Sequence, residues 1–332
     1  MKFSSSAEPL DVLRPLLAKY GSRSTLEHFH ETVNVVFHDV EADVYDDVHR
    51  DMWDSLPEQY RLLLADAGVA RTGPSLRILD IGCGTGLSST LLAGELGPRA
   101  GSLHLLDTSP EMLARAKARL SHVPCPVSAT LGATPDLDGA ARFDLILTCS
   151  VLHHIPDLAA FCQDVSRLLA PGGVFLHLQD PCADSAASTQ RRMRETEYRK
   201  RSQPLIPKSI RRLMPDRVAA AAWRKLRGVT ETGYMDRVNT ELIRRGTIAL
   251  PMADQDIWSV TDIHVGNGAG ISIPAMANLL PACDLVSQRT YGFFSVLASS
   301  LPPSLRAAEA KLIADRSLDG SYVAAAWRKR QR

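Results

Sequence analysis

The stretch LRILDIGCGTGLSSTLL, Leu76 to Leu92, indicates a buried strand followed by a tight turn and a helix. Leucine and isoleucine dominate before the turn, and the apolar pattern after Gly86 has helical spacing. Between them, Gly82, Gly84 and Gly86 leave the backbone bare, which lets a ligand contact the chain itself. The helix that begins there offers free N–H groups and a partial positive charge. We therefore expect a ligand with an anionic group at this turn.

Strands and helices alternate along much of the chain after this stretch. The expected strands are 77–82, 102–107, 126–131, 143–150 and 173–180, with helices at 87–96, 110–120 and 158–169. After a long, mainly helical interruption, the pattern returns as a helix at 274–280, a strand at 284–294, a helix at 306–315 and a strand at 321–329. Strands too apolar to have a solvated face indicate a parallel sheet covered by helices, so we predict an α/β fold.

The composition is that of a globular protein. Of 332 residues, 45% are hydrophobic and 23% are charged, and no apolar run reaches the roughly 20 residues of a membrane-spanning helix. Glu8, Asp11 and Pro15 stand where a signal peptide would need an unbroken apolar stretch. The six cysteines form no C-x-x-C pair, which argues against a zinc cage and a disulfide framework. We expect a cytoplasmic protein with reduced thiols.

Charge is unevenly distributed, although the formal net charge is only +1. The segment Glu31–Asp54 is acidic, whereas the segment Arg191–Arg227 carries thirteen basic residues, and we call the latter the basic block. The basic block has two interpretations. It would attract an acidic partner molecule, or it has no such role and is either a solvated surface or paired with the acidic segment.

An acidic residue closes the second expected strand. Asp107 follows Gly86 by 21 residues, a position from which a carboxylate can accept hydrogen bonds from both hydroxyls of a ribose. The turn itself has the spacing G-x-G-x-G and carries Asp80 two residues ahead, so it differs from the G-x-G-x-x-G of dinucleotide-binding proteins. The ligand therefore contains a ribose but is not expected to be a dinucleotide.

Four motifs in order resemble those of the class I S-adenosylmethionine-dependent methyltransferases. ILDIGCGTG at 78–86 looks like the first motif of that family and LLDTSPEML at 105–113 looks like the second. SVLHHIPD at 150–157 and LLAPGGVFLHLQD at 168–180 look like the later ones. The resemblance runs from about Arg77 to Asp180 and resumes near Ile273. It implies S-adenosyl-L-methionine as the cofactor.

The resemblance also implies a set of cofactor-binding residues. Asp80 would lie near the methionine amino group, Asp107 would bind the ribose and Met112 would lie beside the adenine. Cys83 is expected to pack rather than react. The full expected set is Tyr45, Asp80, Gly82, Cys83, Gly84, Gly86, Asp107, Thr108, Met112, Gly132, Ala133, Thr134 and Cys149.

One position departs from the family pattern. Members often have an acidic residue after the third strand to bind the adenine amino group, but TLGATPDL at 130–137 has Ala133 there. Asp136 is one substitute. The backbone of residues 132–134 is the other, and we favour it.

The resemblance implies a doubly wound, mostly parallel seven-stranded sheet with a Rossmann-like methyltransferase fold. The expected divisions are an N-terminal helical lid at 1–72, a core at 73–181 and 271–332, and a helical insert at 182–270. Tyr45 is expected to cover the cofactor, unless its segment is an ordinary amphipathic helix. The insert leaves the sheet after the fifth strand, at the edge where such sheets bind ligands, so it should roof the acceptor.

Two histidines are candidate general bases for methyl transfer. His154 follows the fourth strand, and His264 lies near Asp262 at the end of the insert. Either could instead be a packing or loop residue. A metal site formed by Asp254, Asp256, Asp262 and His264 is a weaker alternative, and we expect no metal.

We expect methylation of a small-molecule acceptor on oxygen, nitrogen or carbon, in bacterial secondary metabolism. An enzyme that binds S-adenosylmethionine but catalyses a cyclisation or similar reaction is the first alternative. A nucleic-acid methyltransferase is the second, although no RNA-binding module is visible. The expected partner is a small molecule, and the basic block would suit an acidic one. No nucleic acid or membrane partner is expected, and a homodimer stays open.

Overall fold

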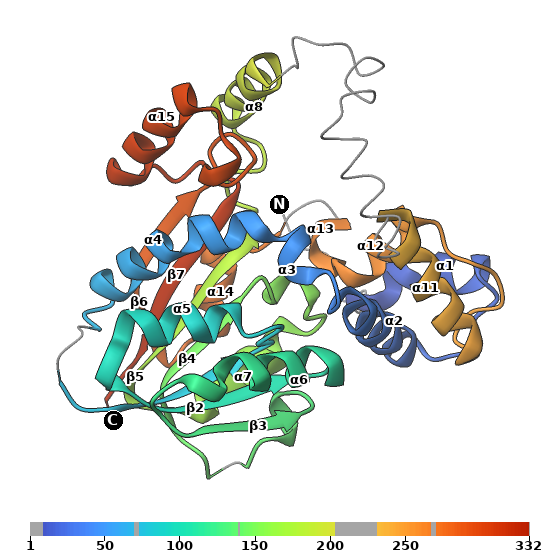
Figure 1. The fold of residues 1–332 in the computed structure, drawn as a ribbon, viewed down its shortest axis with the longest axis horizontal. Coiled ribbons are helices and arrows are strands. Elements are labelled where there is room, and N and C mark those ends of the chain that lie inside the picture. Colours follow the sequence, from blue (N-terminus) through green and yellow to red (C-terminus); the bar gives the residue numbers. More distant parts are fainter. Residues whose placement is uncertain (1–8, 70–72, 139, 203–230, 267–269, 332) are drawn as a thin grey trace.

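A seven-stranded sheet forms the centre of the computed structural model, which describes residues 9–69, 73–138, 140–202, 231–266 and 270–331. Its strand order is β3-β2-β1-β4-β5-β7-β6, and β7 alone runs antiparallel to its neighbours (Figure 1). The strands are β1 (Leu76–Ile81), β2 (Ala100–Asp107), β3 (Val127–Leu131), β4 (Phe143–Cys149), β5 (Leu169–Pro181), β6 (Cys283–Tyr291) and β7 (Tyr322–Lys329). The order reverses between β1 and β4, so the edge beside their carboxyl ends is a switch point for ligand binding.

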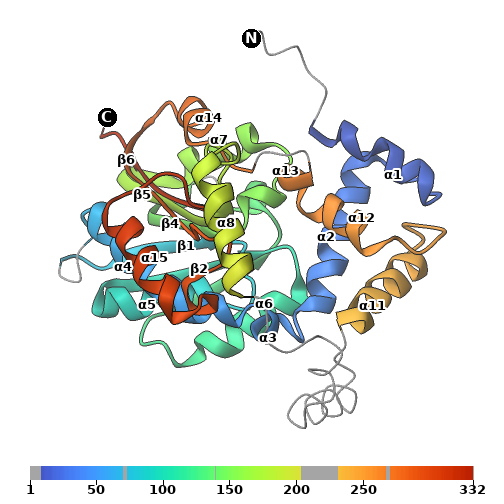
Figure 2. The same cartoon turned by 90° about the horizontal axis from the view of Figure 1, so that it is seen from above.

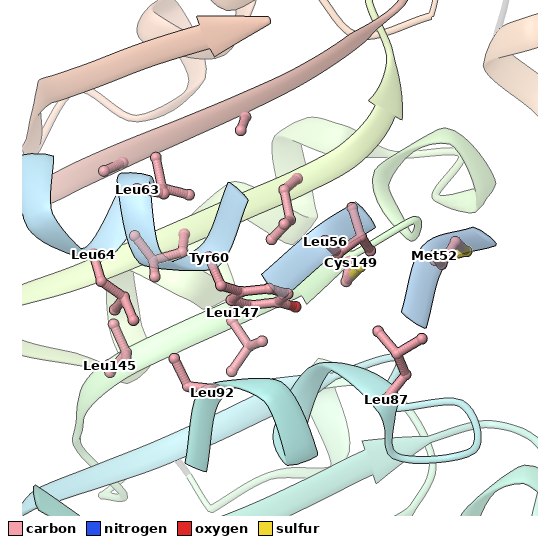
Figure 3. Packing of buried hydrophobic residues seen from close by; sticks show 14 of the residues in the cluster. Met52, Leu56, Tyr60, Leu63, Leu64, Leu87, Leu92, Leu145, Leu147 and Cys149 are labelled. Carbon is pink, nitrogen blue, oxygen red and sulfur yellow. The ribbon is translucent and has the colours of Figure 1, made fainter. Parts of the chain in front are cut away.

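Helices cover both faces of the sheet. On one face lie α4 (Arg50–Asp66), α5 (Leu87–Leu96), α6 (Pro110–Arg119) and α15 (Pro303–Ala314). On the other lie α7 (Leu158–Leu168) and α14 (Ile273–Leu279). Successive strand residues point to opposite faces, so Leu145 and Leu147 join the first cluster while Ile146 joins the second. Figure 3 shows Tyr60 of α4 lying over β4, with Leu92 of α5 beside it.

A separate group of helices, which we call the cap, lies to one side of the sheet (Figure 2). It combines N-terminal and insert helices around one apolar cluster that includes Phe29, Val33, Phe37, Val238 and Ile257. Its helices are α1 (Arg14–Lys19), α2 (Leu26–Glu41), α11 (Glu231–Arg244), α12 (Asp254–Thr261) and α13 (Ile263–Gly266), with the 3-10 helix η1 (Pro9–Leu13) at its start. Segments about 200 residues apart in sequence therefore share one core.

The first described part of the insert lies elsewhere. Helix α8 (Thr189–Arg201) stands beside α15, away from the cap (Figure 1). Arg194 of α8 forms an ion pair of 2.5 Å with Asp319 and donates to the Phe293 carbonyl at 3.2 Å. Residues 203–230, which include most of the basic block, lie outside the described residues.

The predicted α/β class and the mostly parallel sheet are confirmed. One local expectation is wrong: the strand expected at 173–180 begins already at Leu169, where a stop and a turn were expected. Residues 169–172 extend β5, and Leu169 pairs with Phe143 before a register shift. The remaining connections are the 3-10 helices η2 (Gly97–Arg99), η3 (Leu120–His122), η4 (Thr134–Asp136), η5 (Leu152–His154) and η6 (Ala298–Ser300), and the short helix α3 (Tyr45–Val48). In the described part of the chain, no helix has the length and hydropathy needed to span a membrane.

Candidate functional site

A buried carboxylate lies directly before the glycine turn. Asp80 in β1 is fully buried, and its Oδ2 accepts hydrogen bonds from the hydroxyls of Ser88 at 2.5 Å and Ser89 at 2.6 Å. Its second oxygen, Oδ1, is buried without a hydrogen-bond partner among the described residues. Burial raises the pKa of Asp80 to about 6, although the two serines oppose the shift. An ammonium group beside Oδ1 would satisfy this oxygen.

The three glycines of the turn have different surroundings, although all have positive φ angles. A Cβ on Gly82 would come to 2.5 Å from Val151 Cγ2, and one on Gly86 would meet the backbone of Ala116 at 3.1 Å. A Cβ on Gly84 would meet nothing within 4 Å. Gly82 and Gly86 therefore permit close packing of the protein, whereas Gly84 faces open space suited to a ligand.

The second expected cofactor residue holds the turn in place. Asp107 at the end of β2 accepts from the Gly84 N–H at 2.8 Å and from the Ser109 N–H at 2.9 Å. Burial raises its pKa, while the two N–H groups oppose the shift. Each carboxylate oxygen can accept a second bond, so the group can still bind a diol.

The acidic N-terminal segment contacts the far side of this turn. Asp46 in α3 forms an ion pair with Arg119 and accepts from the Thr85 hydroxyl at 2.8 Å. Tyr45, its neighbour, has a pKa raised by burial and also by the nearby Glu41, with Asp107 a further contributor. The role of Tyr45 as a cover for the cofactor stays a prediction.

The acidic segment pairs with arginines from outside the basic block. Arg115 of α6 binds Asp43 at 2.5 Å, and Arg237 of α11 binds the same carboxylate at 3.1 Å. Among the described arginines of the basic block, Arg194 instead binds Asp319 and Arg191 donates to Ser185 at 3.0 Å. The predicted pairing with the acidic segment is therefore wrong for these two arginines.

The remaining expected cofactor residues lie around the same strand ends. Met112 is buried in the first turn of α6, Thr108 is exposed before it, and Cys149 is buried at the end of β4. Cys83 is buried and its pKa is raised well above the ordinary value by burial, as a packing thiol requires.

On the side where the adenine is expected, the two predicted substitutes for the acidic residue are bonded to each other. Asp136 accepts from the Ala133 N–H at 2.8 Å. Thr134 donates from its hydroxyl to Asp164 at 2.8 Å, and Gly132 donates its N–H to the Asp107 carbonyl at 2.9 Å. An adenine contact through Ala133 N–H would therefore replace its bond with Asp136.

Both predicted base histidines link the core to the cap. His154 Nδ1 donates to the Thr261 carbonyl at 2.8 Å, and His264 Nε2 donates to the Ile155 carbonyl at 2.7 Å. Burial lowers the pKa of His154 well below its ordinary value and also lowers that of His264. Each ring is neutral near pH 7 and has one nitrogen committed to a carbonyl.

The histidine with a carboxylate partner is His153, which the sequence analysis did not single out. Its Nδ1 lies 2.8 Å from Asp180 Oδ1, and the same oxygen accepts its backbone N–H at 3.2 Å. Its Nε2 lies 3.8 Å from Asp262 Oδ1. The signal was present in the sequence, because His153 and Asp180 belong to the two motifs that follow β4 and end β5.

The four residues of the predicted metal alternative do not come together. Asp256 accepts from Lys19 Nζ and the Tyr20 hydroxyl, both at 2.5 Å, and so belongs to the cap's own packing. Within the described ranges, His153, His154 and Asp262 bring ligand-type atoms within 4.8 Å of one another. The Nδ1 of His154 carries a proton that it donates to the Thr261 carbonyl, so this nitrogen has no lone pair for a metal. The group therefore offers fewer ligand atoms than the four that zinc requires. We assign no metal to this group.

Part of this chain, including the glycine turn and the ends of β2 and β4, is similar to known proteins. Residues 79–175 match the family model described as "Methyltransferase domain". They include Asp80, the three glycines, Asp107 and His153. This segment is a class I S-adenosylmethionine-dependent methyltransferase domain.

Curated relatives match part of this chain over part of their own length. A ubiquinone biosynthesis O-methyltransferase of Paramagnetospirillum magneticum is 32% identical over 112 residues, which are 33% of this chain and 43% of the relative. A trans-aconitate 2-methyltransferase of Methylobacterium radiotolerans is 40% identical over 128 residues, 39% of this chain and 46% of the relative. The chain thus spans less than half the length of each of these relatives.

Among solved structures, a sarcosine dimethylglycine methyltransferase of Galdieria sulphuraria aligns with 83% of this chain and 85% of its own. The two are 13% identical, with a TM-score of 0.46. A methyltransferase of Haloferax volcanii in complex with its activator covers 88% of this chain and 97% of its own, at 14% identity and a TM-score of 0.47. These similarities are too low to inform the function of the cap.

Proposed function

We propose that this protein transfers the methyl group of S-adenosylmethionine to a small-molecule acceptor, on oxygen, nitrogen or carbon. The buried Oδ1 of Asp80, which has no hydrogen-bond partner among the described residues, is the observation that carries the proposal, and the open space at Gly84 supports it. A buried polar atom without a partner is rare in proteins, and an ammonium group would satisfy it. The family match over residues 79–175 supports the same cofactor.

The residues present fit this cofactor at three points. Asp80 would hold the amino group, the turn around Gly84 would lie under the amino acid portion, and Asp107 would accept from the ribose hydroxyls. Tyr45, Met112 and the other predicted residues would complete its surroundings. When bound, the cofactor supplies an electrophilic methyl group on a sulfonium. The protein's part is mainly alignment, which can contribute about 7 to 11 kcal/mol to lowering the barrier.

The acceptor would bind between the carboxyl ends of β4 and β5 and the cap. His154 and His264 join these parts through the carbonyls of Thr261 and Ile155. Ubiquinone biosynthesis and trans-aconitate methylation are named for relatives that this chain only partly covers. We therefore propose a small molecule as the class of acceptor.

Several finer points stay predictions. They are the division into lid, core and insert, the role in bacterial secondary metabolism, the cytoplasmic location and the homodimer. An acidic acceptor is also a prediction, which rests on the basic block. Most of that block lies outside the described residues, and two of its described arginines bind Asp319 and Ser185.

Two measurements test the proposed function. Calorimetry with S-adenosylmethionine and S-adenosylhomocysteine tests binding, and Asp144→Asn, at the opposite end of β4, is the matched control for cofactor-site variants. Incubation of the protein with methyl-labelled S-adenosylmethionine and an extract of the producing organism tests transfer. Label in a small molecule supports the proposal. Label in nucleic acid would support the second alternative, and an acceptor rearranged without gaining label would support the first.

A further inference from the structure

The pair His153 and Asp180 has the geometry of an oriented base. A carboxylate can only accept, so the short contact of 2.8 Å between His153 Nδ1 and Asp180 Oδ1 places the proton on Nδ1. In the neutral form of the ring, the lone pair is therefore on Nε2. Asp180 is fully buried and also accepts the backbone N–H of His153, which fixes the ring relative to the strand end.

The position of His153 places Nε2 on the acceptor side of the domain. His153 lies in η5, directly after β4, two residues beyond Val151, which packs against Gly82 of the cofactor turn. On the other side its Nε2 faces Asp262, at the junction of α12 and α13, 3.8 Å away. This gap is too long for a hydrogen bond, and a donor group entering it could bond to Nε2.

The two histidines predicted from the sequence are less suited to this role. The Nδ1 of His154 and the Nε2 of His264 each donate to a backbone carbonyl. His154 Nδ1 also lies 3.3 Å from Asp262 Oδ1, but this carboxylate is only partly buried, unlike that of Asp180. A carboxylate both fixes the tautomer and stabilises the imidazolium that forms on proton uptake. His153 alone, among the described histidines of this site, combines a buried carboxylate behind it with a lone pair directed at the cap.

On the basis of the proposed function, we propose that His153 is the general base, that Asp180 is its positioning residue, and that the reacting group of the acceptor is a neutral hydroxyl. His153 Nε2 takes the hydroxyl proton while the oxygen forms its bond to the methyl carbon. The electron pair of the broken carbon–sulfur bond stays on sulfur, which neutralises the sulfonium. The imidazolium passes its proton to solvent. A carboxylate as the reacting group would need no such base.

The charges around His153 favour a neutral reacting group. Three carboxylates face this region: Asp180 from β5, Asp262 from the cap and Glu41 from α2. The neighbouring histidines are His38, His154, His177 and His264, and burial lowers the pKa of the last three. An anionic reacting group would meet these carboxylates, whereas a developing imidazolium would be stabilised by them.

The first test measures which ring nitrogen of His153 is protonated, and it needs no acceptor. In protein labelled with ¹⁵N-histidine, the His153 signals are assigned by their loss in His153→Asn. We expect a protonated Nδ1 and an unprotonated Nε2. Asp180→Asn should disturb this tautomer, because an amide can also donate to Nδ1. A wild-type ring protonated on Nε2 alone would overturn the proposal.

The second test measures transfer to the acceptor isolated by its label from the extract. His153→Asn should lower kcat by about 10² to 10⁴, with KM and the Kd of S-adenosylmethionine nearly unchanged. Its deficit should shrink as the pH rises and the acceptor ionises by itself. Asp180→Asn should also lower kcat at unchanged Kd. His104→Asn, on β2 and bonded to Ser128 and Thr130, and Asp144→Asn are the matched controls and should behave as wild type.

The outcomes separate the two proposals. A wild-type protein that binds S-adenosylmethionine but labels nothing would overturn the proposed function, and the base with it. A fully active His153→Asn variant would overturn the base alone. A labelled product that mild alkali cleaves is a methyl ester and would overturn the neutral hydroxyl. Activity removed by a chelator and restored by zinc would also overturn the base, since His153 would then be a ligand.

Discussion

The carboxylate of Asp107 accepts a 2.8 Å hydrogen bond from the backbone N–H of Gly84. The residue expected to bind the ribose therefore also fixes the tip of the turn expected to lie under the amino acid portion. One side chain thus connects the two halves of the cofactor site, so their geometry is set together.

Replacing Asp107 should weaken cofactor binding more than it weakens the fold. In Asp107→Ala, both S-adenosylmethionine and S-adenosylhomocysteine should lose about 1.5 to 3 kcal/mol, because two ribose hydroxyls lose a charged acceptor. Calorimetry measures the affinities, and thermal unfolding reports the cost of freeing the Gly84 and Ser109 N–H groups. Unchanged affinity in a folded variant would contradict this placement of Asp107.

Two glycines of the turn should respond differently to valine. Gly84→Val should keep the fold, at a cost of about 1 to 2 kcal/mol for its positive φ, and should lose cofactor binding because its side chain fills open space. Gly82→Val should lower the melting temperature further, since Val151 occupies that space. Equal stability of the two variants, or normal binding by Gly84→Val, would argue against this assignment.

The raised pKa of Asp80 predicts opposite pH dependences of binding and stability. Only the carboxylate attracts the ammonium group, so affinity for S-adenosylmethionine should fall about tenfold per pH unit below the pKa of about 6. In the free protein, the neutral acid is favoured by burial. Its contribution to the free energy of unfolding is present below its ordinary pKa of 3.8 and is lost as the pH rises to about 6.

Asp80→Asn should flatten both pH profiles. Calorimetry at several pH values gives the first profile, and chemical denaturation gives the second. A variant whose binding keeps the wild-type pH slope would show that another group titrates in this range.

Removing the two linking histidines should affect turnover less than removing His153. If either were the base, His154→Ala or His264→Ala would lower kcat by about 10² to 10⁴. We expect smaller losses, accompanied by a higher KM for the acceptor, because each ring ties the cap to the core through a carbonyl. Steady-state kinetics with cofactor held saturating separates these results.

A pair of arginines in α8 distinguishes a structural role from recognition of an acidic acceptor. The Arg194 side chain binds Asp319 and the Phe293 carbonyl, whereas the Arg192 side chain donates to Thr189 of its own helix. Arg194→Ala should lower the melting temperature with KM unchanged, and Arg192→Ala should leave the melting temperature near that of wild type. A KM raised in both variants, and raised similarly by salt in the wild type, would instead favour an acidic acceptor.

The strands of the sheet were predictable because each one shows either alternating apolar and polar residues or a short apolar run. Such a pattern depends only on the residues of the strand itself. The expected cofactor residues came from the order of the motifs, and they stay predictions. The motifs did not decide between His153 and His154. In a 3-10 turn adjacent side chains differ in direction by about 120°, and the sequence does not fix which of the two faces Asp180. The partners of the acidic segment were also missed, since Arg115 and Arg237 reach Asp43 through the tertiary fold.

The shared core of the cap has a consequence for biosynthesis. Helix α2 is made early, but its apolar partners in α11 and α12 emerge from the ribosome some 200 residues later. Until then Phe29, Val33 and Phe37 lack their apolar partners from α11 and α12, a state in which a nascent chain is prone to aggregate and to bind chaperones. Strand β7, which follows β6 in sequence, must also insert between β5 and β6. The sheet and the cap are therefore each completed only when a segment far along the chain from its partners has been translated.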